Sequence, residues 1–362
     1  MRPPALPFLA LLASLLVGGP RCTPPRLPYN PDLPALQLSV VGQPPVRDGR
    51  ARFRELFCAL LERESTAGLD CESLLVRFTD EPVVPAETRA LPAHDPRLHL
   101  LLVAGSFAEC FDAARMYPGA VRKLSSLGYA IREVRVSGRS SSAYNTPRIA
   151  RAVARELRVA EGPLVLVGYS KGVTDILEFL IQYPSLAAKV QAVVSIAGSV
   201  NGSPMAERFA GPYRPFASWP VDACPPGDSH VIEDLRRETR MNWLARHRLP
   251  GHIRYFSVGA SAPAPEVGRA MFPIEGPMRR LEPYIDGQLP FYDQLVPGSE
   301  LLGYARADHW AVALPLQEHW PVIAGNPRGA IYPRDLLFEA IVLRTAEALR
   351  ETLSPERPTP LH

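Results

Sequence analysis

Residues 164–172 read LVLVGYSKG, and this stretch decides the fold class. The run LVLV is apolar throughout, as expected of a strand that is buried on both faces of a sheet. Glycines two positions before and two positions after Ser170 follow the strand, and residues 173–183 (VTDILEFLIQY) continue with apolar side chains at helical spacing. A buried strand, a Gly-x-Ser-x-Gly turn and a helix form a sharp turn that lifts the serine hydroxyl above the sheet. We therefore predict that Ser170 is a nucleophile; the alternative is an ordinary turn with a helix-capping serine.

Further apolar runs alternate with helical patterns on both sides of this motif. The strands are expected at 98–105, 128–136, 163–168, 190–198, 252–259 and 300–305, and helices between them at 147–157 and 173–183. Alternation of this kind is typical of an α/β fold with a doubly wound, mostly parallel sheet. Ligands then bind beyond the carboxyl ends of the strands, where Ser170 is expected.

A serine hydroxyl needs a base to accept its proton and a carboxylate to orient that base. His309 is the best candidate for the base, because it follows the expected strand at 300–305 in a late loop, and His319 is the second choice. The acid is expected between serine and histidine in the chain. Asp293, in DQLVP shortly before that strand, is favoured, and Asp286 remains the alternative. Asp308 adjoins the histidine in sequence, so its side chain cannot easily face the same ring.

An oxyanion formed at Ser170 would need two backbone N–H donors. The amide of Lys171 directly follows the nucleophile and is the first candidate, with the lysine side chain expected to point outward. The loop after the strand at 98–105 would supply the second, because Gly105 permits close approach of the backbone. Within that loop we favour the amide of Ser106, with Phe107 next.

Taken in order, Gly105-Ser106, GYSKG at 168–172, DQLVP at 293–297 and Asp308-His309 resemble the α/β-hydrolase superfamily, particularly its lipase and esterase branch. The resemblance covers roughly residues 98–316. It implies ester hydrolysis through an acyl-enzyme, with Ser170, Asp293 and His309 in the catalytic roles. Two positions depart from the usual pattern: Ala104 stands where many lipases have His, and Lys171 replaces an uncharged residue.

The chain is expected to divide into three parts. Residues 1–22 have an early Arg, a short apolar stretch and small residues, which is typical of a secretory signal peptide. A Pro-rich linker and N-terminal extension follow at 23–95, with a helix expected at 50–64 and a strand at 73–78. Residues 96–362 form the hydrolase domain, with a cap or lid insertion at about 203–250. The insertion contains aromatic residues that could line an acyl pocket, with core packing as the alternative: Phe209, Tyr213, Phe216 and Trp219.

The signal peptide predicts an exported protein, periplasmic or secreted; lipid anchoring at Cys22 is not favoured, because Gly-Pro-Arg precedes it. The five cysteines show no metal-ligand spacing, so no metal site is expected. In an exported protein Cys58 and Cys71 could form a disulfide across a short helix and turn. Buried thiols are the alternative.

Charge and composition limit the partners. The formal net charge is +3 on 40 basic and 37 acidic residues, so no strongly basic surface is predicted and nucleic acid is not an expected partner. The expected substrate is a small-molecule or lipid ester. Association with a membrane surface is therefore compatible with this interpretation, and no cofactor is expected. An acyltransferase or thioesterase would use the same triad, and a non-catalytic binding protein could share the fold.

Overall fold

The computed structural model of the chain describes residues 43–64, 69–77, 81, 91–111, 114–207, 226–228 and 230–353. The predicted signal peptide, and the cap aromatics Phe209, Tyr213, Phe216 and Trp219, lie outside the described residues. Within the described part, no helix combines the length and the apolar character needed to cross a membrane.

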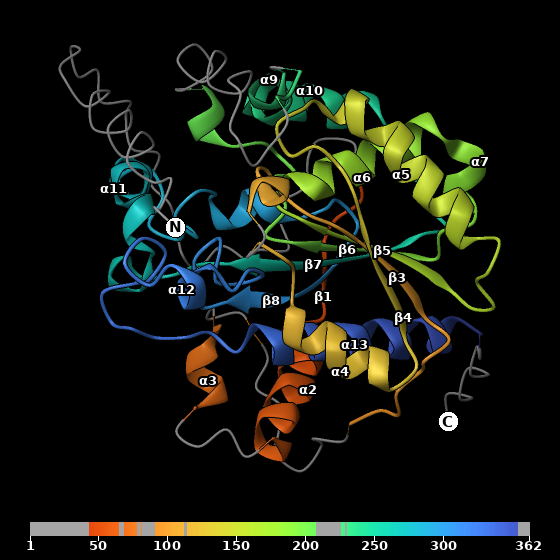
Figure 1. Cartoon of the computed structure of the whole chain (residues 1–362), viewed down its shortest axis with the longest axis horizontal. Coiled ribbons are helices and arrows are strands. Elements are labelled where there is room, and N and C mark those ends of the chain that lie inside the picture. The colour runs from red at the N-terminus through yellow and green to blue at the C-terminus, as the bar shows by residue number, and fades with distance from the viewer. Residues whose placement is uncertain are drawn as a thin grey trace, which may run out of the picture.

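The core is an eight-stranded, mostly parallel sheet (Figure 1). Its order is β1-β8-β7-β6-β5-β3-β4, and β2 pairs with β8 as the antiparallel member. This confirms the predicted α/β fold class, and the six predicted strands all form. The strands are β1 (Arg47–Asp48), β2 (Leu75–Val76), β3 (His99–Val103), β4 (Ala130–Val134), β5 (Leu164–Tyr169), β6 (Ala192–Ile196), β7 (Arg254–Ala260) and β8 (Glu300–Ala305).

Helices cover both faces of the sheet, because successive side chains of a strand point to opposite faces. In β3, Leu100 and Leu102 belong to one apolar cluster, whereas Leu101 and Val103 belong to another. The first cluster is completed by helices α2, α4 and α13, and the second by α5 and α6, as the two helical layers of Figure 1 show. These helices are α2 (Arg50–Arg63), α4 (Pro118–Ser126), α5 (Ser142–Glu156), α6 (Lys171–Gln182) and α13 (Arg334–Leu353); the short α7 (Pro184–Ala187) follows α6.

The predicted N-terminal extension adds to the same sheet. Both β1 and β2 pair with β8, and α2, which confirms the helix expected at 50–64, packs against α13. The strand expected at 73–78 is confirmed only at β2. Its first two residues, 73–74, belong instead to the short helix α3 (Cys71–Leu74), which Asp70 caps by accepting a hydrogen bond from the Glu72 amide. A disulfide joins Cys58 to Cys71 and thereby ties α3 to α2.

Irregular segments and short helices lie at the carboxyl end of the sheet. The described part of the predicted cap contains α9 (Val231–Leu235) and α10 (Arg237–Arg246). The connection from β7 to β8 contains α11 (Phe272–Arg279) and three short 3-10 helices, η4 (Ala264–Glu266), η5 (Arg269–Met271) and η6 (Phe291–Gln294). A further 3-10 helix, η3 (Ala108–Cys110), follows β3, and α12 (Leu316–His319) lies after β8.

Candidate active site

Ser170 occupies a strained turn between β5 and α6. Its backbone has φ 53° and ψ −125°, outside the regions that L-residues favour, and its amide donates to the Ile196 carbonyl at 3.0 Å. The two flanking glycines are required by close packing. A Cβ on Gly172 would lie 2.1 Å from the Val103 carbonyl oxygen, and a Cβ on Gly168 would lie 2.8 Å from the Val173 nitrogen. The turn therefore has the strained strand-to-helix geometry that the sequence predicts.

His309 joins Ser170 to a carboxylate. Its Nε2 lies 2.8 Å from Ser170 Oγ, and its Nδ1 lies 2.7 Å from Asp286 Oδ2. Because an ionised carboxylate only accepts hydrogen bonds, Nδ1 carries the proton and Nε2 is left to accept from the serine hydroxyl. All three side chains are buried. Such an arrangement can supply a nucleophile, a base and a group that orients the base.

Backbone contacts hold both His309 and Asp286. The His309 amide donates to the Asp286 carbonyl at 2.7 Å, and the His309 carbonyl accepts from the Tyr169 hydroxyl at 2.6 Å. The other carboxylate oxygen of Asp286, Oδ1, accepts from the amides of Gln288 and Leu289 at 2.8 and 2.7 Å. Every oxygen of the Asp286 carboxylate therefore has a donor, and neither side chain depends on the other alone for its orientation.

The sequence prediction that Asp293 contacts His309 is wrong. Asp293 lies in η6 with its side chain buried, and its charged neighbour is Arg237 of α10, at 3.2 Å from Oδ1 to Nη2. Neither carboxylate oxygen receives a hydrogen bond from the described residues. Burial raises the pKa of Asp293 to about 7, and the Arg237 guanidinium offsets this only in part. Asp286, the sequence alternative, takes the position beside the histidine.

Two other candidates from the sequence, Asp308 and His319, form no hydrogen bond with the His309 ring. Asp308 turns away from that ring, as predicted, and accepts backbone hydrogen bonds from Gly268, Trp310 and Ala311 at 2.7 to 2.9 Å. Its burial raises its pKa to about 6. His319 is exposed at the end of α12. Asp308 therefore shapes the loop that carries His309, a role that sequence position alone did not indicate.

The two predicted oxyanion donors lie on backbone that adjoins Ser170. Lys171 is the first residue of α6, so its amide has no acceptor within the helix. Gly105 packs against Ser170 so closely that a Cβ there would lie 2.8 Å from Ser170 Cβ, and Ser106 follows it directly. The expectation that the Lys171 side chain points outward is wrong: it is fully buried, and its ammonium pairs with Asp175.

A cavity of about 280 Å³ opens beside this loop, at the carboxyl ends of β3 and β4. Gly105 belongs to its wall, together with charged side chains from both sides of the cavity: Glu109, Arg115, Glu133 and Arg135. Burial raises the pKa of Glu109, whose carboxylate accepts backbone hydrogen bonds from Gly138 and Arg139. The cavity is therefore a polar recess next to the candidate oxyanion loop, not an apolar channel.

Comparison with known proteins supports the fold class. The chain is similar to the metagenomic carboxyl esterase MGS0156, with 32% sequence identity, a TM-score of 0.77, and coverage of 96% of this chain and 100% of that one. It is also similar to the mature form of the Bacillus licheniformis lipase BlEst2, with 17% identity, a TM-score of 0.47, and coverage of 61% of this chain and 88% of that one. The second likeness is too distant to inform substrate or mechanism. No family model matches the sequence, and a search of curated proteins gives no match.

Proposed function

Because the chain belongs to the α/β-hydrolase superfamily, in its lipase and esterase branch, we propose that it is a serine hydrolase that cleaves carboxylic esters. The observation that carries the proposal is the continuous path from Asp286 through His309 to Ser170, with distances of 2.7 and 2.8 Å. These lie within the hydrogen-bond reach that proton transfer requires.

In the proposed reaction Ser170 Oγ attacks the ester carbonyl carbon while His309 Nε2 takes the hydroxyl proton. The imidazolium so formed is stabilised by Asp286, whose carboxylate stays ionised. The carbonyl oxygen becomes an oxyanion, for which we assign the amides of Lys171 and Ser106 as donors. The intermediate collapses as His309 gives its proton to the departing alcohol, which leaves an ester of Ser170.

Water then hydrolyses the ester of Ser170 through the same steps in the opposite order. His309 takes a proton from the attacking water, the second tetrahedral intermediate forms at the same donors, and Ser170 Oγ leaves with the proton returned by His309. The products are a carboxylic acid and an alcohol, and no cofactor enters the balance. The strained backbone of Ser170 supports this role, because strain of this kind persists where the surrounding structure holds a functional group in place.

The test is release of p-nitrophenol from acyl esters of increasing chain length. We expect turnover by the wild type and a fall of kcat by about 10⁵ to 10⁶ for Ser170→Ala and His309→Ala. His319→Ala is the matched control, because His319 is exposed, and its activity should equal that of the wild type. A wild type that turns over none of the esters, or a Ser170→Ala variant that retains activity, would refute the proposal. Ester products formed when methanol is added would instead indicate acyl transfer.

We further propose that the protein works outside the cytoplasm. The disulfide between Cys58 and Cys71 supports this, because such bonds persist in oxidising compartments. The signal-like order of residues 1–22 is the second argument. Mass spectrometry of the protein recovered from an extracytoplasmic fraction should show loss of this segment and an oxidised Cys58–Cys71 peptide. An intact N-terminus with both thiols reduced would contradict export.

A further inference from the structure

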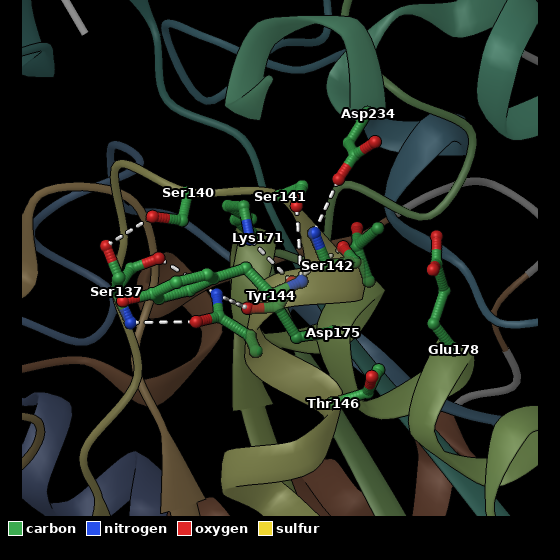
Figure 2. A network of polar contacts seen from close by, with 12 residues as sticks. Ser137, Ser140, Ser141, Ser142, Tyr144, Thr146, Lys171, Asp175, Glu178 and Asp234 are labelled. Carbon is green, nitrogen blue, oxygen red and sulfur yellow. Dashed lines mark hydrogen bonds and ion pairs between the residues drawn. The ribbon is translucent and has the colours of Figure 1, made fainter. Parts of the chain in front are cut away.

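The buried Lys171 side chain enters a polar network between α5 and α6 (Figure 2). Its Nζ donates to Asp175 Oδ1 at 2.5 Å. Asp175 also accepts from Ser142 Oγ at 2.6 Å and from Asn145 Nδ2 at 2.8 Å. We call Lys171, Asp175, Ser142, Asn145 and Ser137 the Asp175 network. The Lys171–Asp175 ion pair is fully enclosed, and both carboxylate oxygens of Asp175 have hydrogen-bond donors, as a buried charge requires.

The network reaches the loop that carries the second oxyanion donor. The Asn145 side chain forms two hydrogen bonds with the Ser137 backbone. Its Oδ1 accepts from the Ser137 N–H at 2.9 Å, and its Nδ2 donates to the Ser137 carbonyl at 2.8 Å. The next residue, Gly138, packs directly on the loop after β3. A Cβ on Gly138 would lie 2.4 Å from the Phe107 nitrogen and 2.7 Å from the Gly105 carbonyl oxygen. Displacement of residues 137–138 would therefore displace the backbone around Ser106.

Part of the predicted cap holds the same loop from the other side. The Ser142 amide donates to Asp234 Oδ2 at 2.5 Å, and the Ser141 amide donates to Asp228 Oδ1 at 2.9 Å. Gly227 lies so close that a Cβ there would come within 1.9 Å of the Arg139 carbonyl oxygen. Figure 2 shows Asp234 reaching down to Ser142 from the cap segment. The loop at 137–142 is thus fixed between the cap and the Asp175 carboxylate.

We propose that Lys171 and Asp175, through the Asp175 network, set the distance between the two oxyanion donors. The lysine is then a residue with two roles: its amide is one donor, and its side chain fixes the loop that positions the other. The inference rests on the proposed function, because it assigns a role in stabilising the tetrahedral intermediate. Asp175, Ser142 and Asn145 form no hydrogen bond with Ser170 or His309, so they are positioning residues. Such an effect is plausible in size, since loss of one donor costs about 10² to 10³ in kcat.

The first test compares two buried hydroxyl groups on α5. Ser142→Ala removes a donor to Asp175, whereas Thr146→Val removes a hydroxyl that donates to Gln182 at 2.8 Å, outside the network. We expect Ser142→Ala to lower kcat about 10-fold with KM unchanged, and to weaken a boronic acid inhibitor by the same factor, because its tetrahedral adduct needs the same donors. Thr146→Val should match the wild type in all three quantities.

The second test removes the charges together, so that no unpaired charge is left buried. Lys171→Met combined with Asp175→Asn should lower kcat about 100-fold at constant KM. Its control is Arg344→Met combined with Glu300→Gln, which removes an ion pair between α13 and β8 at 2.7 Å on the other side of the sheet. That control should lose thermal stability but keep kcat. If the Lys171 pair variant does not fold, Ser142→Ala decides.

The outcomes separate this inference from the proposed function. A wild type that neither hydrolyses esters nor is labelled at Ser170 by a fluorophosphonate would overturn both. An active wild type with a Ser142→Ala variant whose kcat and boronic acid affinity equal those of Thr146→Val would overturn the positioning role alone. A rise in KM at constant kcat would overturn it as well, because it would indicate a role in binding the substrate rather than the tetrahedral intermediate.

Discussion

Asp286 and Asp293 lie on the same connection between β7 and β8, and both side chains are fully buried, yet their surroundings are opposite. Asp286 accepts from His309 and from two backbone amides. Asp293 has a guanidinium at 3.2 Å, and its carboxylate oxygens accept no hydrogen bond from the described residues. Both oxygens of the Asp286 carboxylate have donors, whereas burial raises the pKa of Asp293 and so favours its neutral form.

The difference shows that burial alone does not identify the acid of a triad. What separates the two residues is the direction of the chain: the turn at Asp286 and Gly287 brings the backbone against the His309 loop, where the His309 amide donates to the Asp286 carbonyl. Gly287 has φ 98°, a conformation that favours glycine. At η6 the chain lies away from the His309 loop and close to α10. There the backbone N–H of Asn201 donates to the backbone carbonyl of Asp293.

The comparison predicts its largest effect on activity. Asp286→Asn should lower kcat by about 10⁴, because the amide cannot hold the imidazolium and favours the wrong tautomer of His309. Asp293→Asn should change kcat by less than about 3-fold. Both substitutions preserve side-chain volume, so each is the control of the other in a p-nitrophenyl ester assay. Equal losses in the two variants, or a larger loss for Asp293→Asn, would reverse the assignment.

The sequence predicted the fold class and two of the three residues that meet at the candidate site, Ser170 and His309, because their signals are local. The apolar strands, the glycines around Ser170 and the late histidine each carry their meaning within a few residues. The preference for Asp293 over Asp286 was wrong, since both residues lie on a loop before β8 and only the path of that loop distinguishes them. An Asp-Gly turn was visible, but turn capping explained it equally well.

Lys171 was mispredicted for a related reason. Nothing near Lys171 in the sequence indicates that Ser142 and Asn145 of α5 donate hydrogen bonds to Asp175 of α6. The spacing of Lys171 and Asp175, four residues along a helix, does place them on one face. Whether that face is buried depends on how α5 packs against α6, which is a contact between distant parts of the chain.

Stability should show the same contrast between the carboxylates, as a function of pH. The Asp293 pKa is about 7 in the folded protein, above the ordinary value near 3.9. The folded state therefore binds the proton more tightly, and the resulting stabilisation is present below about pH 4 and is lost as the pH rises toward 7. Asp293→Asn removes this dependence and should raise the free energy of unfolding by on the order of 4 kcal/mol at pH 8, but little at pH 4.

Urea unfolding of the wild type and Asp293→Asn at pH 4 and pH 8 would measure this difference. Asp286→Asn serves as the comparison, and it should not gain stability at pH 8, because it replaces a carboxylate that has donors on both oxygens. A stability gain for Asp293→Asn that is the same at both pH values would mean that titration of Asp293 is not its cause.

The smallest expected effect concerns the loop that makes Asp286 the partner. Tyr169→Phe removes the hydroxyl that donates to the His309 carbonyl at 2.6 Å and leaves that buried acceptor without its donor. Loss of one partner in a buried hydrogen bond costs about 1 to 3 kcal/mol. We expect a destabilisation in this range and a fall of kcat of about 5-fold. The His309 ring keeps its hydrogen bond with Asp286, but the His309 backbone is held less firmly. If kcat falls as far as in Asp286→Asn, the hydroxyl is essential to the triad geometry; if stability and kcat are both unchanged, the contact with Asp286 is sufficient to hold the loop.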